Sequence, residues 1–173
     1  MRPAFIVSAP AVEEKPFHYP NSDEPVGRRR ALSRAAGMEI LGINLVRLQP
    51  GERSSWPHAE ADEEEFAYVI EGAVECWIDG HLHPLKPGDF VGFPKATGIS
   101  HCFINNSAQD AVLLVGGEAN KPEARVYYPF HPHRKTDIGD ACWWDPPAKA
   151  ALGPHDGLPD RLRSQPARKT SSA

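Results

Sequence analysis

Cysteine is scarce in this chain, and its scarcity argues against two classes of protein. Only Cys76, Cys102 and Cys142 occur among the 173 residues. An odd number of cysteines without a Cys-x-x-Cys pair fits neither a dense disulfide framework nor a cysteine-rich zinc site. We therefore expect a reducing, cytoplasmic setting.

Long hydrophobic runs and an excess of positive charge are also missing. Residues 5–7 are too few for the apolar segment of a secretory signal, and no later run approaches the length of a membrane span. The net charge of −4 gives no field that would gather nucleic acid. We expect the basic residues at 28–30 and 161–169 to be solvated. The sequence therefore predicts a soluble protein without a membrane or nucleic-acid partner.

Proline is abundant, and its 18 positions argue against a helical bundle, because proline removes a backbone donor and breaks helix interiors. Short apolar stretches separated by turns are instead typical of a sandwich or barrel. Asp79-Gly80 readily supplies the positive φ angles of a type I′ hairpin turn. We predict an all-β domain with an edge strand from Arg28 and strands at 39–49, 66–70, 74–78, 81–85, 89–93, 98–104, 111–117 and 125–128.

The chain length favours one domain, with irregular segments at both ends. We divide the sequence into an N-terminal arm with an edge strand (1–37), a barrel (38–128) and an irregular C-terminal wrapping tail (129–173). The arm is proline-rich and is expected to lie on the barrel or on a neighbouring molecule. In the tail, Trp143 and Trp144 are large apolar side chains that we expect to dock, either as a lid over the site or as staples to the barrel wall.

The first candidate site motif runs from Gly51 to Gly72. If this segment is extended, His58 and Glu60 share one face, because strand side chains alternate with a period of two. Glu65 follows at the start of an apolar strand. A lone acidic loop beside a histidine is usually only a solvated surface, but a matching second motif favours a site here.

That second motif runs from Gly88 to Asn105 and contains Pro94 and Gly98 before its histidine. His101 lies at the end of this punctuated turn, at the start of a predicted strand. It supplies a fourth potential ligand at a distance in the sequence. The two motifs together predict one site with two histidines and two carboxylates.

The paired motifs resemble those of the cupin superfamily. In that family the first motif contains His-x-His and a later Glu, and the second contains Pro-x-Gly followed by a third His. The resemblance covers residues from about 38 to 128. Glu60 stands where many cupins carry the second histidine, and three residues rather than one separate Pro94 from Gly98. The resemblance implies a cupin-type β-barrel, which is a double-stranded β-helix or jelly roll.

Histidine and carboxylate are the ligands expected of Fe, Mn or Zn, and also of Ni or Co. We predict that His58, Glu60, Glu65 and His101 bind one such divalent ion, with Glu60 as fourth ligand or as a catalytic acid/base beside it. Two coordinating carboxylates would neutralise the ion. Such a site would attract anions less than a three-histidine site and would favour harder ions such as Mn²⁺ or Fe²⁺.

Two other histidine pairs have the same spacing but no carboxylate partner. His81 with His83 and His131 with His133 are therefore predicted to be surface residues. Cys102 has the opposite strand parity to His101, so we expect its thiol to point away from the metal and into the core.

The predicted function is that of a metal-dependent cupin enzyme acting on a small oxygen-containing organic substrate. Dioxygenase chemistry, an oxidoreductase reaction, needs free positions on a redox ion, whereas isomerase or lyase chemistry needs a general base, for which Glu60 is the candidate. The alternative is a non-catalytic small-molecule binder or sensor. We expect a homodimer, because the arm with residues 28–34 could cover an exposed sheet edge of a partner.

Overall fold

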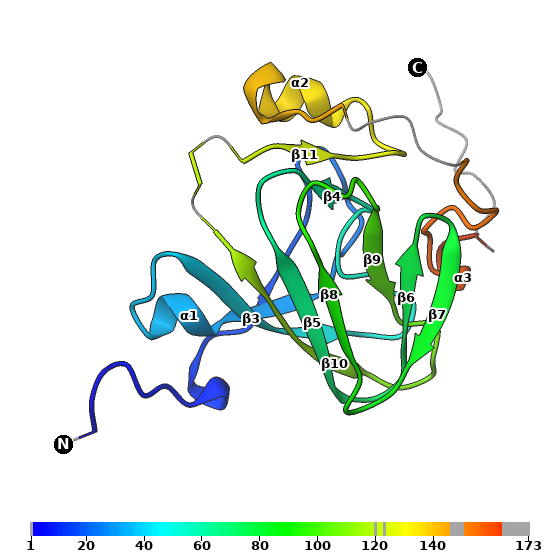
Figure 1. The fold of residues 1–173 in the computed structure, drawn as a ribbon. Helices are drawn as coiled ribbons and strands as arrows, with labels where there is room; N and C mark the ends of the chain where they lie inside the picture. Colours follow the sequence, from blue (N-terminus) through cyan, green and yellow to red (C-terminus); the bar gives the residue numbers. More distant parts are fainter. Residues whose placement is uncertain (1, 120, 123, 146–150, 164–173) are drawn as a thin grey trace, which may run out of the picture.

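The barrel is formed by two β-sheets that face each other, and short helices lie at its periphery (Figure 1). The computed structural model describes residues 2–119, 121–122, 124–145 and 151–163. The all-β prediction is confirmed. The larger sheet has the order β1 (Lys15–Pro16), β2 (Arg28–Ala31), β3 (Leu41–Leu48), β10 (Ala111–Glu118), β5 (Glu65–Glu71) and β8 (Phe90–Phe93).

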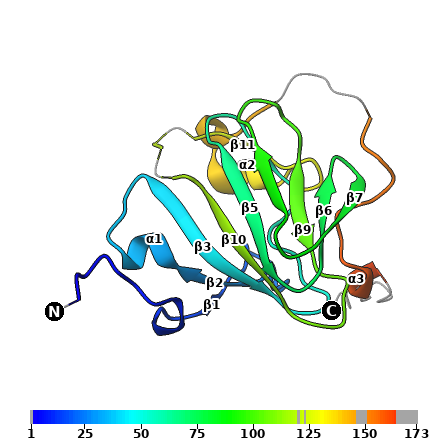
Figure 2. The same ribbon diagram turned by 60° about the horizontal axis from the view of Figure 1, so that its bottom comes forward.

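The second sheet has the order β7 (His81–Leu85), β6 (Val74–Ile78) and β9 (His101–Ile104). A two-stranded pair, β4 (Ala59–Glu60) with β11 (Val126–Tyr127), lies across one end of the barrel (Figures 1 and 2). The short helical segments are η1 (Ala9–Ala11), α1 (Leu32–Ala35), α2 (Arg134–Ile138), η2 (Asp140–Cys142) and α3 (Asp160–Arg163). None of the helices within the described residues has the length and apolar character that crossing a bilayer requires.

The main hydrophobic core lies between the two sheets. Strand alternation explains its composition, because Ala67 and Val69 of β5 are buried while Tyr68 and Ile70 between and after them are 42% and 45% exposed. The inward parity predicted for this strand is confirmed. The other buried members of the core come from β3, β6, β9 and β10: Val46, Leu48, Val74, Cys76, Phe103, Ala111 and Leu113.

The β6–β7 hairpin has the predicted turn. Asp79 and Gly80 have φ angles of 43° and 91°, and both must be positive in a type I′ turn. A side chain at Gly80 would also meet the backbone of Gly153, since an added Cβ would lie 2.3 Å from its nitrogen. The tail therefore packs directly on this hairpin.

The N-terminal arm is joined to the barrel of its own chain. β1 pairs with β2, and β2 pairs with β3, so both strands extend the larger sheet. Farther along the arm, Glu24 makes a two-point ion pair with the buried Arg53, at 2.6 and 2.8 Å. Arg53 also donates to the carbonyl of Gly157 in the tail, at 2.9 Å. One buried guanidinium thus connects the arm, the barrel and the tail.

A second apolar cluster fixes the middle of the tail. Trp143 is buried against the group formed by Tyr19, Trp56 and Tyr128, with Val26 behind them. Trp144 is half-buried, and its backbone nitrogen donates to the carbonyl of Val126 at 3.0 Å. The expectation that the tryptophans dock is therefore met most fully by Trp143.

Candidate metal centre

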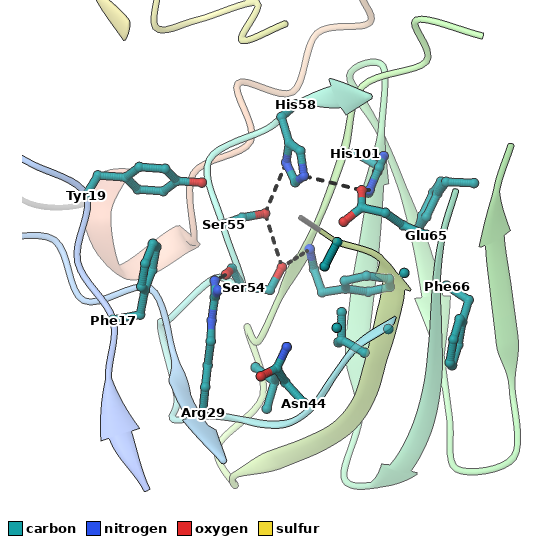
Figure 3. A pocket seen from close by; sticks show the side chains of 18 of the residues that line it. Phe17, Tyr19, Arg29, Asn44, Ser54, Ser55, His58, Glu65, Phe66 and His101 are labelled. Carbon is teal, nitrogen blue, oxygen red and sulfur yellow. Dashed lines mark hydrogen bonds and ion pairs between the residues drawn. The ribbon is translucent and has the colours of Figure 1, made fainter. Parts of the chain in front are cut away.

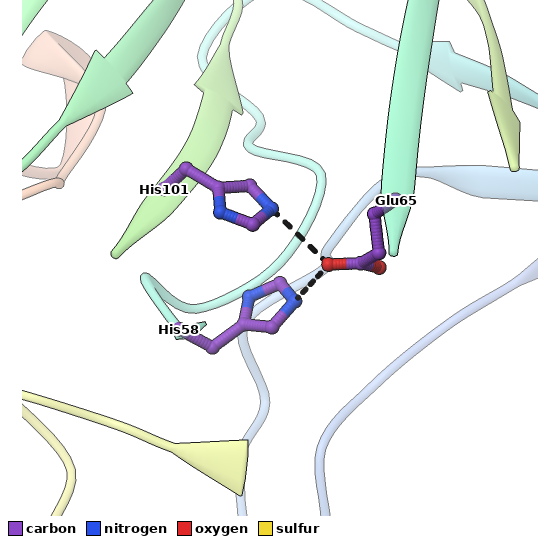
Figure 4. Close-up of side chains that lie close together, drawn as sticks. All are labelled: His58, Glu65 and His101. Carbon is purple, nitrogen blue, oxygen red and sulfur yellow. Dashed lines mark ion pairs between the residues drawn. The ribbon is translucent and has the colours of Figure 1, made fainter. Parts of the chain in front are cut away.

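Three of the predicted ligands lie together at one end of the barrel (Figure 4). His58, Glu65 and His101 each offer a ligand atom, and these atoms lie within 4.8 Å of one another. Oε2 of Glu65 is 3.2 Å from Nε2 of His101 and 3.5 Å from Nε2 of His58. We call this group the His58–Glu65–His101 triad.

Backbone pairing holds the two histidines side by side. The amide of His101 donates to the carbonyl of His58 at 2.8 Å, and the amide of His58 donates back at 3.2 Å. Residues paired in this way in antiparallel strands project their side chains from the same face. The ring centroids of His58 and His101 are consequently only 4.9 Å apart.

Glu65 reaches the histidines from the opposite sheet. It opens β5, where it is paired with Phe93 of β8 and Gly117 of β10. A Cβ at Gly117 would lie 3.1 Å from Cγ of Glu65 and 2.6 Å from the carbonyl oxygen of Glu64. Glycine therefore leaves the room that the Glu65 side chain needs. Phe93 also stacks on the ring of His101, with centroids 3.4 Å apart.

Burial and mutual charge shift the proton affinities within the triad. Burial alone would raise the pKa of Glu65, but His101 and then His58 lower it well below its usual range. Burial lowers the pKa of His58, whereas the Glu65 carboxylate outweighs burial and raises it to about 9. The pKa of His101 is lowered, with burial as the main cause.

The donor set fits a divalent cation. Nδ1 of His58 donates to the carbonyl of Trp56 at 2.9 Å, so in the neutral ring Nε2 carries a lone pair. That lone pair points at Oε2 of Glu65, which is buried and has no hydrogen-bond partner among the described residues. Either a proton or a bound cation is needed between these two acceptors. The second imidazole, from His101, completes a set of ligands suited to a metal.

Glu60, the remaining predicted ligand, does not belong to this group. The chain changes pairing partners between the two positions: His58 bridges to His101, whereas Glu60 pairs with Val126 in the separate β4–β11 pair. His58 and Glu60 are therefore held by different strands. Burial, followed by nearby carboxylates, raises the pKa of Glu60 to about 7 although His58 opposes the shift. The charges of His58 and Glu65 therefore affect the pKa of Glu60, although Glu60 is not a member of the triad.

A cavity of about 580 Å³ opens from the triad into the barrel (Figure 3). This is the size of a site for a small molecule. Its wall combines apolar and aromatic side chains with a comparable number of polar and charged ones. Besides the triad, the wall includes Phe17, Tyr19, Arg29, Ser54, Ser55, Phe93, Glu118, Tyr128 and Arg134.

Arg29 contradicts the expectation that the basic run at 28–30 is solvated, because its side chain lines the cavity. Strand alternation was the available signal, since the middle residue of three in β2 must face opposite to its neighbours. His131 is not a free surface residue either. Its ring stacks on Trp56 with centroids 3.9 Å apart.

The other histidines and the cysteine follow the sequence predictions. His81, His83 and His133 are exposed. Cys102 is fully buried with Trp77 and Ile104, on the side of β9 away from the triad. Burial raises the pKa of the Cys102 thiol far above its usual value, so this cysteine is an unreactive core residue.

Comparison with known proteins agrees with the fold. A family model for the cupin domain matches residues 44–117. The curated protein SchB of Streptomyces halstedii is 34% identical over 112 residues, which cover 58% of this chain and 78% of SchB. The chain belongs to the cupin superfamily.

Two solved structures are also similar. One, described as a sugar phosphate isomerase of the cupin superfamily from Silicibacter pomeroyi, has a TM-score of 0.67 at 33% identity and covers 71% of this chain and 80% of its own. The other is described as a putative sugar phosphate isomerase from Acidithiobacillus ferrooxidans. It has a TM-score of 0.65 at 30% identity, and the match covers 73% of this chain and 81% of the other protein. Both descriptions name an enzyme.

Proposed function

We propose that this protein is a metal-dependent cupin enzyme that catalyses an isomerase- or lyase-type proton transfer on a small oxygen-containing molecule. The observation that carries the proposal is the triad in the wall of a cavity of about 580 Å³ that is lined by both apolar and polar side chains. The similarity to two structures described as sugar phosphate isomerases supports this reaction class.

In this proposal, His58, Glu65 and His101 hold one divalent ion, of Fe, Mn or Zn, or of Ni or Co. When bound, the ion supplies a Lewis acid that polarises a carbonyl or hydroxyl oxygen. The protein fixes the ligands beforehand. The carbonyl of Trp56 and the hydroxyl of Ser55, at 2.9 and 3.4 Å, orient the ring of His58 through Nδ1. The stacked ring of Phe93 orients His101.

Glu60 is the proposed proton acceptor. Its carboxylate lies close enough to His58 and Glu65 to interact with their charges, but it is not a member of the triad. A carboxylate beside a metal, rather than on it, is free to take a proton from a neighbouring carbon. Exchange of Glu60 for glutamine should therefore leave the ion bound and stop proton transfer.

A second candidate is dioxygenase chemistry, and one observation favours it. Two histidines and one carboxylate form the three-ligand arrangement that leaves open positions on a redox ion. Apart from Glu65, the carboxylate in the cavity wall is Glu118, and it is paired with Lys121 at 2.7 Å. Glu60, the proton acceptor of the first proposal, is not part of that wall, and this counts in favour of the second candidate.

One experiment separates these candidates. The metal-loaded protein is incubated in D₂O with a panel of aldose and ketose phosphates and other small carbonyl compounds. Proton–deuterium exchange is followed by NMR, and oxygen uptake by an electrode. Exchange without oxygen uptake supports the proposal, and substrate-dependent oxygen uptake favours the dioxygenase. Ligand binding with neither reaction would leave a non-catalytic binder or sensor and overturn the enzyme proposal. The same measurements on His101→Ala, which removes a proposed ligand, should show neither reaction. His83→Ala, which removes an exposed histidine, serves as its control.

A further inference from the structure

Arg29 places a positive charge in the cavity, apart from the triad (Figure 3). It lies in the middle of β2, and its side chain projects inward while Arg30, the next residue, does not line the cavity. Arg30 instead pairs with Glu14 at 3.4 Å. The two arginines are therefore neighbours in sequence with different surroundings.

The guanidinium of Arg29 is only partly satisfied by the protein. Nη2 donates to the carbonyl of Ser54 at 3.0 Å, and the group lies over the ring of Phe17 at 4.0 Å. Nε is buried and has no hydrogen-bond partner among the described residues. Among the residues that the structure describes, no carboxylate lies within ion-pair distance of Arg29. A buried charge without a counterion is costly, so its retention calls for a partner that binds from outside.

The other charges in the wall already have partners. Arg134 pairs with Asp137 at 2.8 Å, and Glu118 pairs with Lys121 at 2.7 Å. Glu65 belongs to the triad. Burial lowers the pKa of Arg29, and the charge of Glu65 only partly opposes this shift. The positive charge that the protein leaves unbalanced in this cavity is therefore that of Arg29.

We propose that Arg29 is the anion-binding residue of the cavity, and that its guanidinium holds a carboxylate or phosphate group of the small molecule that binds there. The planar fork of arginine matches the oxygens of both groups. Ser55, Tyr19 and Tyr128 add hydroxyl groups to the same wall. A ligand bound in this way would extend from Arg29 towards the triad, and this orientation alone rests on the proposed function.

The position of Glu60 strengthens this inference. Sequence reasoning counted two carboxylates on the ion and expected a neutral centre that attracts anions weakly. With Glu60 outside the triad, Glu65 is the one anionic ligand, so a divalent ion there would keep one positive charge. Arg29 adds a second positive charge to the same cavity. A small anion is therefore the class of ligand that the cavity favours.

The test uses inorganic phosphate and acetate as probes, with glycerol as the uncharged control. Each is titrated into metal-free full-length protein at millimolar concentrations while the Nε–H resonance of Arg29 is followed by NMR. We expect phosphate or acetate, but not glycerol, to shift this resonance. Arg29→Gln should weaken binding about tenfold or more, because a charge-assisted contact is lost. Arg29→Lys should weaken it less, and Arg30→Gln should leave it unchanged.

The tighter probe identifies the anionic group as phosphate or carboxylate. An unmoved Arg29 resonance in the wild-type protein would overturn the inference, and so would equal affinities in the wild type and Arg29→Gln. The wild-type measurement decides the matter even if the Arg29 variants fail to fold. Because the protein is metal-free, failure here leaves the metal centre untouched, and failure of the metal centre leaves this result standing.

Discussion

His58 and His101 exchange both of their backbone hydrogen bonds, so two distant segments of the chain place their imidazoles on one face. This pairing fixes the side-chain separation before any ligand binds. Glu65 then approaches from the facing sheet and puts one carboxylate oxygen near both Nε2 atoms. A site preorganised by backbone pairing needs little rearrangement to accept an ion.

The buried pair between Arg53 and Glu24 predicts a large stability effect. Arg53→Met removes a nearly inaccessible guanidinium and leaves Glu24 with only the indole N–H of Trp56, at 3.0 Å, from this network. We expect the free energy of unfolding to fall by about 3–5 kcal/mol. Chemical denaturation measures it. Lys86→Ala, which removes the exposed pair with Asp89, should cost less than about 1 kcal/mol. Similar losses in both variants would contradict this account of the network.

Stability should fall in acid because of His131. Its ring is stacked on Trp56, and burial, followed by the charges of Arg53 and His133, lowers its pKa from 6.5 to about 4. The unfolded chain therefore takes up this proton first, and stability is lost as the pH falls from about 6.5 to about 4. His131→Asn should show a shallower loss over that window in thermal unfolding at a series of pH values. Parallel curves for the two proteins would disprove the assignment.

The tail tryptophans should differ in their contribution. Trp143→Ala opens the cluster with Tyr19 and Tyr128, and such a change typically costs about 3–5 kcal/mol. Trp144 is only half-buried, so Trp144→Ala should cost clearly less. Trp143 is not part of the cavity wall, and we expect a staple rather than a lid. Unchanged stability but weaker ligand binding in Trp143→Ala would favour the lid. A point variant is the better test, because truncation after Tyr128 would also remove Arg134 from the cavity wall.

A homodimer is still our expectation, although the arm pairs with its own barrel. Tyr68, Ile70 and Phe90 are exposed on the outer face of β5 and β8, at 42%, 45% and 64%. Such an apolar row is suited to a two-fold contact. Light scattering should give twice the monomer mass, and Ile70→Glu should reduce it. A monomer mass for the wild type at micromolar concentration would exclude this dimer.

The sequence predicted the triad because ligand spacing and strand parity both carry the information. Glu65 opens a strand whose next inward residues, Ala67 and Val69, are buried as expected. The hairpin at Asp79 and Gly80 was predictable from the positive φ angles that this dipeptide adopts. Local chemistry was sufficient for the hairpin, whereas the triad was predictable because two separate motifs carry its ligands.

Other features depend on which segments meet in space, and the sequence does not state this. Glu60 lies two residues from His58 as the period requires, but the chain switches from β9 to β11 between them. The sequence predicts a solvated charged run at 28–30, whereas strand alternation turns Arg29 into the cavity. His131 packs on Trp56 only because the tail folds back over the barrel.

Metal analysis of the purified, reconstituted protein tests the central claim most directly. We predict one divalent ion per chain in the wild type and in the control His83→Ala, and loss of the ion in His58→Ala, Glu65→Ala and His101→Ala. Glu60→Gln should retain it, since Glu60 lies outside the triad. Loss of the ion from Glu60→Gln would restore Glu60 as a ligand. Full stoichiometry with unchanged affinity in His101→Ala would contradict the account.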